Sequence, residues 1–264
     1  MDKIRVDILL VQRGLVESQS KAQRFVMAGQ VRVNGEIVPK PSVAVPQNAS
    51  IEIKTSREYV SRGGKKLIAA LSEFNVQVKG LVCADVGAST GGFTDCLLQH
   101  GAARIYAIDV GYGVLHWKLR NDVRVVVMER TNARYLESLP ELVSLVTVDA
   151  SFISLNYLLP VIKNWFKDQP GRVIALIKPQ FEAGREQARV GGGVIRDEAV
   201  HVEVLERVLQ AAGSMGYVIK GLIASPLRGP KGNIEFLADL EFNCDLSIID
   251  LEALVLGAIE GAPA

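Results

Sequence analysis

The sequence has few of the residues that build disulfide frameworks, zinc sites and membrane spans. Its three cysteines, Cys83, Cys96 and Cys244, show no C-x-x-C spacing, so we expect neither a disulfide framework nor a zinc site. No segment offers the roughly 18 apolar residues that cross a membrane, and the start lacks a signal peptide's apolar core and cleavage site. These absences predict a cytoplasmic protein without a metal and without stable membrane association.

Histidine is equally scarce, which argues against a serine hydrolase. Residues 87–91, GASTG, match the G-x-S-x-G nucleophile elbow, in which Ser89 would be the nucleophile. Such a serine needs a later acid and a histidine, but His100, His116 and His201 do not stand at the ends of clear strands. The hydrolase interpretation is therefore disfavoured.

Charge is balanced over the whole chain but divided unevenly along it. The 264 residues carry a formal net charge of +1, and residues 1–56 hold eight Lys/Arg against five Asp/Glu, a net +3. The remaining 208 residues hold 22 against 24, a net −2. A phosphate-binding surface is therefore expected to include the amino-terminal part.

The first 56 residues have the pattern of a small α+β domain. Apolar spacing predicts helices over residues 6–13 and 18–29. Alternation around Asn34-Gly35 predicts a type I′ hairpin, and a further strand follows Pro46. Basic side chains of this unit are expected to face an RNA backbone, although a scatter of solvated charges is the alternative. The candidates are Arg5, Arg13, Lys21 and Arg24.

Residues 5–54 resemble the RNA-binding domain of ribosomal small-subunit protein S-four. The motifs S-x-x-K-A, at 18–22, and G-x-V-x-V-N-G, at 29–35, occur in the order of that domain. The resemblance implies that this unit binds RNA.

The residue composition changes at residues 57–63, REYVSRG, which we interpret as a linker between domains 1–56 and 64–264. Arg62, Lys65 and Lys66 then stand at the beginning of a predicted helix, KKLIAALSEF. Cations are unfavourable at a helix amino terminus, which hints at an anionic partner such as RNA or at carboxylates from elsewhere in the chain. A solvated lysine pair is the alternative interpretation.

From residue 81 the pattern alternates between strands and helices, which predicts an α/β domain with a mostly parallel, Rossmann-like sheet covered on both faces. Seven strands are predicted, and the last one is expected to enter antiparallel. The predicted strands are 81–86, 104–109, 123–129, 144–149, 172–178, 217–224 and 235–242. The predicted helices are 92–100, 114–120, 154–166, 197–213 and a tail helix in LSIIDLEALVLGAIEG.

The first of these strands ends in Asp85 and a glycine turn, where a nucleotide would bind in a doubly wound sheet. The turn lacks G-x-G-x-x-G spacing, since Gly87 is followed by Ala88, Ser89 and Thr90, so NAD is not expected. Its glycines suit a ligand without phosphates, such as the methionine end of S-adenosylmethionine.

A second acid, Asp109, ends the next apolar run. It stands where a carboxylate would accept hydrogen bonds from both ribose hydroxyls of an adenosine. The alternative is an acid that satisfies its own turn.

Charged residues also follow two later strands. Asp149 and Lys178 come after SLVTV and RVIALI, so both are expected in the same crevice as the glycine turn. A partly desolvated lysine is tolerable mainly beside an acid, and Asp149 is the natural partner. Glu235 and Lys66 would complete a cluster of two cations and two anions.

Lys66, Asp149, Lys178 and Glu235 fall where the Lys-Asp-Lys-Glu tetrad lies in the FtsJ-like ribose methyltransferases. The motifs YVSRGGKKL, DVGASTGGFTD, DASFISL, IKPQFE and SPLRGPKGNIEF further resemble the TlyA family, which joins an S-four-type domain to such a methyltransferase. SRGGKKL departs from the family's frequent SRGAHKL and leaves Lys66, before Leu67, as the match. The cofactor-binding residues that follow are Asp85, Gly87, Ser89, Gly91, Gly92, Phe93, Asp109 and Asp149.

The resemblance implies methyl transfer from S-adenosylmethionine to the 2′-hydroxyl of a cytidine in ribosomal RNA. Lys178 is expected to take the hydroxyl proton, with Asp149 fixing its direction and Glu235 orienting Lys66 or the ribose. Small-subunit RNA, large-subunit RNA or both remain open as substrates, as do the target nucleotide and the oligomeric state.

Two alternatives belong to other classes of protein. TlyA proteins are often labelled haemolysins, but the most apolar predicted helix, at the tail, carries acids and no Lys or Arg, unlike an interfacial membrane helix. A silent RNA-binding protein is disfavoured by the intact tetrad.

Overall fold

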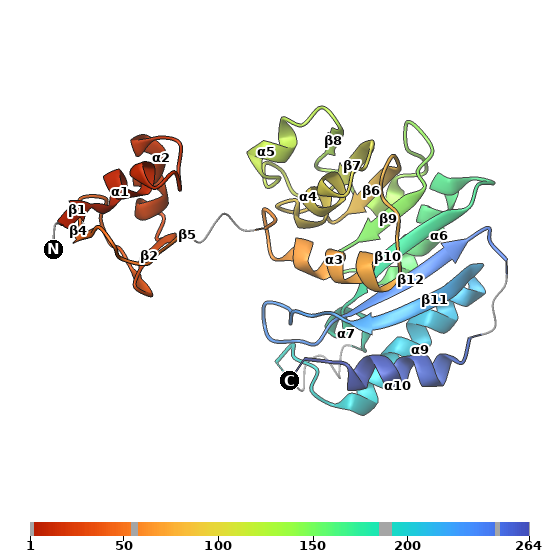
Figure 1. Ribbon diagram of the computed structural model, residues 1–264. Coiled ribbons are helices and arrows are strands. Elements are labelled where there is room, and N and C mark those ends of the chain that lie inside the picture. The colour runs from red at the N-terminus through yellow and green to blue at the C-terminus, as the bar shows by residue number, and fades with distance from the viewer. Residues whose placement is uncertain (1–2, 54–57, 185–191, 246–248, 264) are drawn as a thin grey trace. The chain divides into compact units, whose positions relative to one another are not determined.

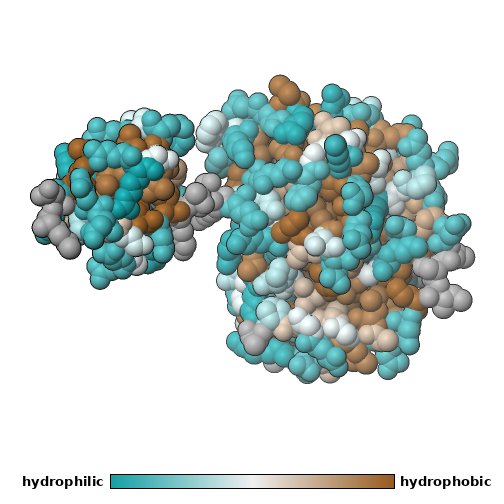
Figure 2. Space-filling model, in the orientation of Figure 1, coloured by the Kyte–Doolittle hydropathy of each residue, from teal (hydrophilic) through white to brown (hydrophobic). Residues whose placement is uncertain are grey.

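The computed structural model describes residues 3–53, 58–184, 192–245 and 249–263. The chain forms two compact units, Met1–Glu58 and Tyr59–Ala264, each with its own hydrophobic core (Figure 1). Hydrophilic residues cover much of the visible surface of both units (Figure 2). The division falls inside the segment 57–63 that the sequence predicts as a linker, and Tyr59 is already buried in the core of the larger unit.

The smaller unit packs two helices against short antiparallel strands. Its elements are β1 (Lys3–Arg5), α1 (Val6–Gln12), α2 (Gln19–Met27), β2 (Val31–Val33), β3 (Glu36–Ile37), β4 (Ala44–Pro46) and β5 (Ile51–Ile53). β1 pairs with β4, and β2 lies between β3 and β5. Leu10 and Val31 are fully buried in its core. The sequence predicts the helices, the hairpin and the strand after Pro46. It misses β1 and β4, because neither flanks a turn signal such as Asn34-Gly35.

The hairpin turn explains why this short unit has a defined register. Asn34 and Gly35 have φ angles of 49° and 85°, as a type I′ turn requires. The Asn34 side chain also accepts a hydrogen bond from the Ser50 amide, at 2.9 Å, and so ties the turn to the approach of β5.

The larger unit is a seven-stranded sheet with the order β11-β12-β10-β9-β6-β7-β8, which confirms the predicted α/β fold. Its strands are β6 (Val82–Val86), β7 (Arg104–Ile108), β8 (Val125–Met128), β9 (Leu145–Val148), β10 (Gly171–Ile177), β11 (Tyr217–Ala224) and β12 (Phe236–Phe242). β12 runs antiparallel to both β10 and β11, whereas β10, β9, β6, β7 and β8 run parallel to one another. The predicted antiparallel entry of the last strand is therefore confirmed.

Helices cover both faces of this sheet (Figure 1). They are α3 (Gly63–Glu73), α4 (Gly92–Gln99), α5 (Trp117–Arg120), α6 (Leu155–Phe166), α7 (Pro179–Glu182), α9 (Glu198–Ser214) and α10 (Leu251–Glu260), with a 3₁₀ turn, η1, at Ala133–Tyr135. Alternate strand residues belong to two different cores: Ala84 packs with α6 and α9, and Cys83 with α3 and α4. The tail helix lies where the sequence predicts it, although residues 246–248 of that prediction lie outside the described residues.

β6 lies inside the sheet, between β9 and β7, which places the glycine turn after β6 at a switch of strand order. The carboxyl ends of β6, β7, β9 and β10 meet at the same edge. The start of α3 and the segment before β12 reach this edge as well, because their residues line the cavities described below.

Candidate active site

The turn after β6 can be built only from glycine at its first position. Gly87 has a φ of +82°, and a Cβ there would stand 2.7 Å from the backbone oxygen of Asp149. Gly91, which begins α4 with a φ of +95°, leaves no room for a Cβ beside Leu119. The turn is therefore pressed against the end of β9, and its backbone borders the crevice.

The rest of the turn is held by contacts from neighbouring elements. The Ser89 amide donates to a carboxylate oxygen of Asp109 at 2.8 Å. A Cβ on Gly92 would stand 2.2 Å from Ser61 Oγ, so the segment before α3 packs tightly on α4. Phe93 is buried beside Gly63 and lines the cavity next to the turn.

Asp109, directly after β7, has both carboxylate oxygens on backbone amides. One oxygen accepts from Ser89 and the other from Gly111, at 2.7 Å. Each oxygen keeps a second lone pair, so the carboxylate, which lines a cavity of about 310 Å³, can still accept hydrogen bonds from a ligand. Asp109 can therefore hold its own turn and bind a ligand at the same time, so the two interpretations from the sequence are compatible.

Asp85 points elsewhere. It lies one position before the end of β6, on the face of the sheet that packs against α4, and is fully buried. It accepts hydrogen bonds from Thr94 Oγ1 at 2.6 Å and Thr147 Oγ1 at 3.0 Å. Burial raises its pKa to about 6. Within the described part of the chain, it lines none of the three cavities around the glycine turn.

Two ion pairs line the crevice beside the turn, and each contains a buried lysine. Lys66 Nζ lies 2.5 Å from Glu235 Oε2, and Lys178 Nζ lies 2.7 Å from Asp149 Oδ1. The two lysines are 9% and 7% exposed and Glu235 is 1% exposed. Buried charges are costly unless they are paired, so each ion pair makes the burial of its lysine tolerable. All four residues line one cavity of about 600 Å³.

Lys178 has further acceptors in the loop after β9. It donates to Ser151 Oγ at 2.9 Å and approaches the Asp149 carbonyl oxygen at 3.4 Å. Three acceptors match the three hydrogens of an ammonium group. Its direction is therefore set by a single loop.

Glu235 depends on a glycine in the preceding loop. A Cβ on Gly229 would stand 2.4 Å from Glu235 Oε1, so the loop closes over the carboxylate only without a side chain there. Asn233, 2% exposed, donates to the Gly193 carbonyl at 2.8 Å and accepts from the Ile195 amide at 2.9 Å. The loop is thus anchored two residues before Glu235.

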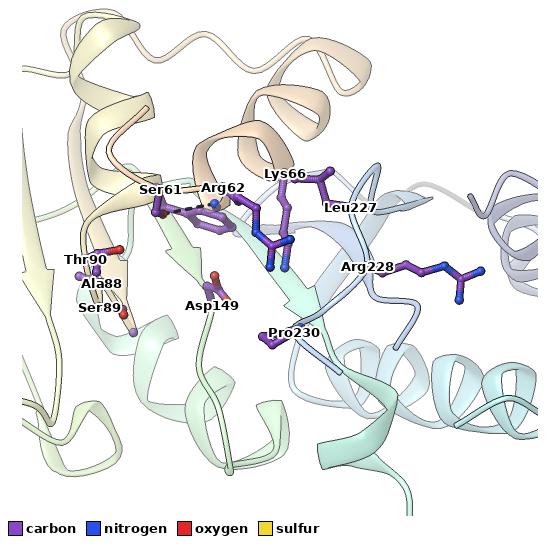
Figure 3. A pocket seen from close by; sticks show the side chains of 14 residues that line it. Ser61, Arg62, Lys66, Ala88, Ser89, Thr90, Asp149, Leu227, Arg228 and Pro230 are labelled. Atoms are coloured by element: carbon purple, nitrogen blue, oxygen red, sulfur yellow. Dashed lines mark hydrogen bonds between the residues drawn. The ribbon is translucent and has the colours of Figure 1, made fainter. Parts of the chain in front are cut away.

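Three neighbouring cavities share Gly87, Ser89 and Asp149. Their volumes are about 220, 310 and 600 Å³; the first extends towards α3, the second towards Asp109 and the third towards the tetrad of Lys66, Asp149, Lys178 and Glu235. In Figure 3, Asp149 lies between Ser89 of the turn on one side and Arg62 with Lys66 on the other. The glycine turn and Asp149 therefore border all three cavities.

Sequence reasoning missed several lining residues. Ser151 contacts Lys178, and Phe152 is 90% exposed with its ring centroid 4.8 Å from that of Phe181. Phe152 has a φ of +64°, which is uncommon for a residue with a bulky side chain. The available signal was position alone, since Ser151 and Phe152 lie two and three residues after Asp149 and Phe181 lies three residues after Lys178.

The predicted RNA-binding residues of the smaller unit differ in their engagement. Arg5 forms two hydrogen bonds with the buried carboxylate of Asp7, which holds the pKa of Asp7 well below its ordinary value. Arg13 donates to the backbone oxygens of Ala49 and Gln47. Lys21 pairs with Glu17, and Arg24 is exposed.

In the larger unit, Arg62 and Lys65 are exposed at the start of α3. Arg62 also lines the 220 Å³ cavity together with Lys66 and Arg228. Its guanidinium group lies beside the Lys66 side chain in Figure 3, whereas the Arg228 side chain points away from the centre of the cavity.

The described residues contain no group of three or more His, Cys, Asp or Glu side chains arranged to hold a metal ion. Nor do they include a helix with the length and apolar character needed to span a bilayer.

Comparison with known proteins decides the family. The model of the FtsJ-like methyltransferases matches residues 59–242, and the model of the S4 domain matches residues 4–51. The chain belongs to the TlyA family of FtsJ-like methyltransferases. Both expected resemblances are thereby confirmed.

Relatives in this family match over almost the whole length. The 16S/23S rRNA (cytidine-2′-O)-methyltransferase TlyA of Mycobacterium tuberculosis strain H37Rv is 44% identical, over 99% of each chain. Hemolysin A of Brachyspira hyodysenteriae is 42% identical, over 89% of this chain and 98% of its own. A solved structure from Streptococcus thermophilus, provisionally named a hemolysin, is 45% identical with a TM-score of 0.73, over 99% of this chain and 97% of its own.

Proposed function

We propose that the protein methylates the ribose 2′-hydroxyl of a cytidine in ribosomal RNA and uses S-adenosylmethionine as its cofactor. One observation carries the proposal: the ion pairs Lys66–Glu235 and Asp149–Lys178 line the same cavity as the glycine turn after β6. A ribose hydroxyl is a weak nucleophile that must be oriented and deprotonated, and a cluster of paired charges beside a nucleotide turn can do both.

The residues around the turn fit the cofactor. Gly87 lets the turn pack against the end of β9 with its backbone bordering the crevice, and Asp109 keeps lone pairs for the ribose hydroxyls of an adenosine. We assign the lobe of about 310 Å³ to the adenosine and the lobe of about 220 Å³, which Phe93 lines, to the methionine end. Bound S-adenosylmethionine supplies an electrophilic methyl group on its sulfonium.

Asp85 acts indirectly in this assignment. Its carboxylate joins β6 to α4 through Thr94 and to β9 through Thr147. It therefore holds the glycine turn in shape from inside the sheet and does not contact the cofactor.

Lys178 is the residue that we assign to the hydroxyl proton. An ammonium group has no lone pair, so Lys178 must first release one proton to water before it can accept the proton of the ribose hydroxyl. The contact with the Asp149 carbonyl oxygen, at 3.4 Å, is the longest of the three that Lys178 makes. The hydrogen bond in that direction is therefore the one that breaks most easily. Asp149 and Ser151 then keep the nitrogen aimed while the acceptor hydroxyl occupies the third direction.

Lys66 and Glu235 supply charge and orientation on the other side of the cavity. Glu235 neutralises Lys66 in the resting site and keeps carboxylate lone pairs that can receive a ribose hydroxyl. Lys66 remains a donor for RNA oxygens. Neither role requires a metal.

Ribosomal RNA is the proposed partner. We therefore assign the reaction to the cytoplasm, where that RNA is found. The S4 unit carries the net +3 segment, and Arg24, Arg62 and Lys65 are exposed cations that can meet phosphates. Because the relative from Mycobacterium tuberculosis is named for both 16S and 23S RNA, both subunits should be tested as substrates.

The test is methyl transfer in vitro from radiolabelled S-adenosylmethionine to purified 30S and 50S subunits, followed by mapping of ribose methylation. We expect label at a cytidine 2′-oxygen. Absence of transfer to either subunit under conditions where the cofactor binds would reject the proposal. A haemolysis assay with the same preparation addresses the activity implied by the name of the Brachyspira hyodysenteriae relative, for which the described residues offer no membrane-spanning helix.

A further inference from the structure

The two short segments that carry Asp149 and Lys178 also contact each other outside that ion pair. One is the loop after β9, which holds Asp149 and leads into α6; the other is α7, which follows Lys178. They meet through the Lys178–Asp149 pair and through the Phe152–Phe181 ring contact. A third contact lies further along both segments and involves Glu182.

Glu182, the last residue of α7, closes the start of α6. Its Oε2 accepts a hydrogen bond from Ser154 Oγ at 2.6 Å, and its Oε1 accepts one from the Leu155 amide at 2.8 Å. Ser154 is the N-cap of α6 and itself accepts from the Asn156 amide at 3.2 Å. The amino terminus of α6 is thus capped twice, by its own N-cap residue Ser154 and by Glu182 of α7. A carboxylate is favourable at that end of a helix.

This carboxylate is not placed for contact with substrate. In the part of the chain that the structure describes, Glu182 lines none of the three cavities around the glycine turn. Burial raises the pKa of Glu182 above its ordinary value. The two hydrogen bonds therefore hold a carboxyl group that is largely withdrawn from water. Its backbone oxygen also accepts from Arg207 of α9, at 2.7 Å, which anchors α7 from behind.

We propose that Glu182 is a positioning residue that sets the distance between Asp149 and Lys178, an inference that rests on the proposed methyltransferase function. Few residues separate this contact from the ion pair in either segment. Glu182 stands four residues after Lys178, across a turn that begins with Pro179, and Ser154 stands five residues after Asp149. Loss of the contact frees both segments at once, and small misplacements of reacting groups lower rates strongly.

The test compares Glu182→Ala with Glu182→Gln in the full-length protein. Alanine removes both hydrogen bonds. Glutamine keeps an acceptor for the Leu155 amide and offers an NH₂ donor to Ser154 Oγ, so it should preserve the contact. We expect alanine to lower kcat about tenfold or more and glutamine to stay within about threefold of wild type, as displaced catalytic geometry would give.

Calorimetric affinity for S-adenosylmethionine should match wild type in Glu182→Gln and fall less than kcat in Glu182→Ala, because Glu182 does not face the cofactor and acts only through the loop that lines the 310 Å³ lobe. That split between kcat and cofactor affinity, with rescue by glutamine, is not expected from general loss of structure. Glu137→Ala, at an exposed glutamate, is the matched control and should keep wild-type kcat. Hydrogen exchange should increase at residues 149–155 in the alanine variant only.

Ser154→Ala is the second variant in case Glu182→Ala does not fold. It removes one of the two contacts with Glu182, and a kcat reduced severalfold is expected. Wild-type kcat in a folded Glu182→Ala protein, or in Ser154→Ala, would overturn the positioning role. Inactivity of the wild-type enzyme on both ribosomal subunits would instead count against the proposed function, so the two failures are distinguishable.

Discussion

At the scale of single residues, Lys178 combines burial, an acidic partner and a hydroxyl neighbour in one cavity. Lys178→Ala should abolish methyl transfer and leave the affinity for S-adenosylmethionine unchanged, because the amine is assigned to the RNA hydroxyl. Lys178→Arg should fail equally, since a guanidinium group does not give up a proton near neutral pH. Single-turnover assays and calorimetry measure the two quantities. An active arginine variant would leave Lys178 only a role in positioning.

Asp109→Ala is the matched variant with the opposite pattern. Removal of a carboxylate that receives two amides and faces the adenosine lobe should weaken cofactor binding by about 1–3 kcal/mol. RNA affinity, measured by filter binding, should stay near that of the wild type. Unchanged cofactor affinity would assign Asp109 to the turn alone.

Asp85 predicts a dependence of stability on pH. Burial raises its pKa from 3.8 to about 6, so its contribution is fully present below pH 3.8 and is lost as the pH rises through about 6. Asp85→Asn should therefore gain stability relative to wild type between pH 4 and pH 7, by up to about 3 kcal/mol at about 1.4 kcal/mol per pKa unit. Urea unfolding at both pH values measures this gain, and a difference independent of pH would contradict the assignment.

At the scale of elements, the turn between β6 and α4 depends on one close approach. Gly87→Ala places a Cβ 2.7 Å from the Asp149 carbonyl oxygen, whereas Gly113, with a φ of +71°, has nothing within 4 Å of its Cβ position. Both alanine variants incur about 1–2 kcal/mol of left-handed backbone strain. Only Gly87→Ala should also lose cofactor affinity and kcat. Equal behaviour of the two variants in thermal unfolding and calorimetry would mean that strain alone matters.

At the scale of the whole molecule, the two units divide their tasks. A fragment that begins at Arg57 should fold and bind S-adenosylmethionine, because the larger unit has its own core on both faces of the sheet. It should methylate ribosomal RNA poorly, because the deletion removes eight of the 30 Lys/Arg residues and leaves a segment of net −2. Binding to rRNA fragments at several salt concentrations and turnover should be compared with the full-length protein. Retention of affinity, salt dependence and rate would remove the smaller unit from RNA docking.

The sequence by itself determined the succession of strands and helices along the larger unit and identified the charged residues that line the cavity of about 600 Å³. Hydrophobic runs that end in Asp149 and Lys178 identify strand ends, and parallel strands present those ends at one edge of the sheet. The glycines after β6 and the Asn34-Gly35 turn are equally readable, because positive φ angles select for glycine and asparagine. Local rules of this kind act over a few residues, and a sequence displays them directly.

The sequence anticipates the Asp149–Lys178 pair, whereas only the tertiary structure decided the other pairs and where each side chain points. Lys66 and Glu235 are 169 positions apart, and their ion pair exists because α3 and the segment before β12 converge at the same edge. Asp85 faces α4 because it stands one residue before the end of its strand, where side chains alternate between faces. Arg13 binds two distant backbone oxygens of its own unit, and Glu182 joins two segments near the site. Such contacts depend on the packing of the whole fold, since distance along the chain carries no information about them.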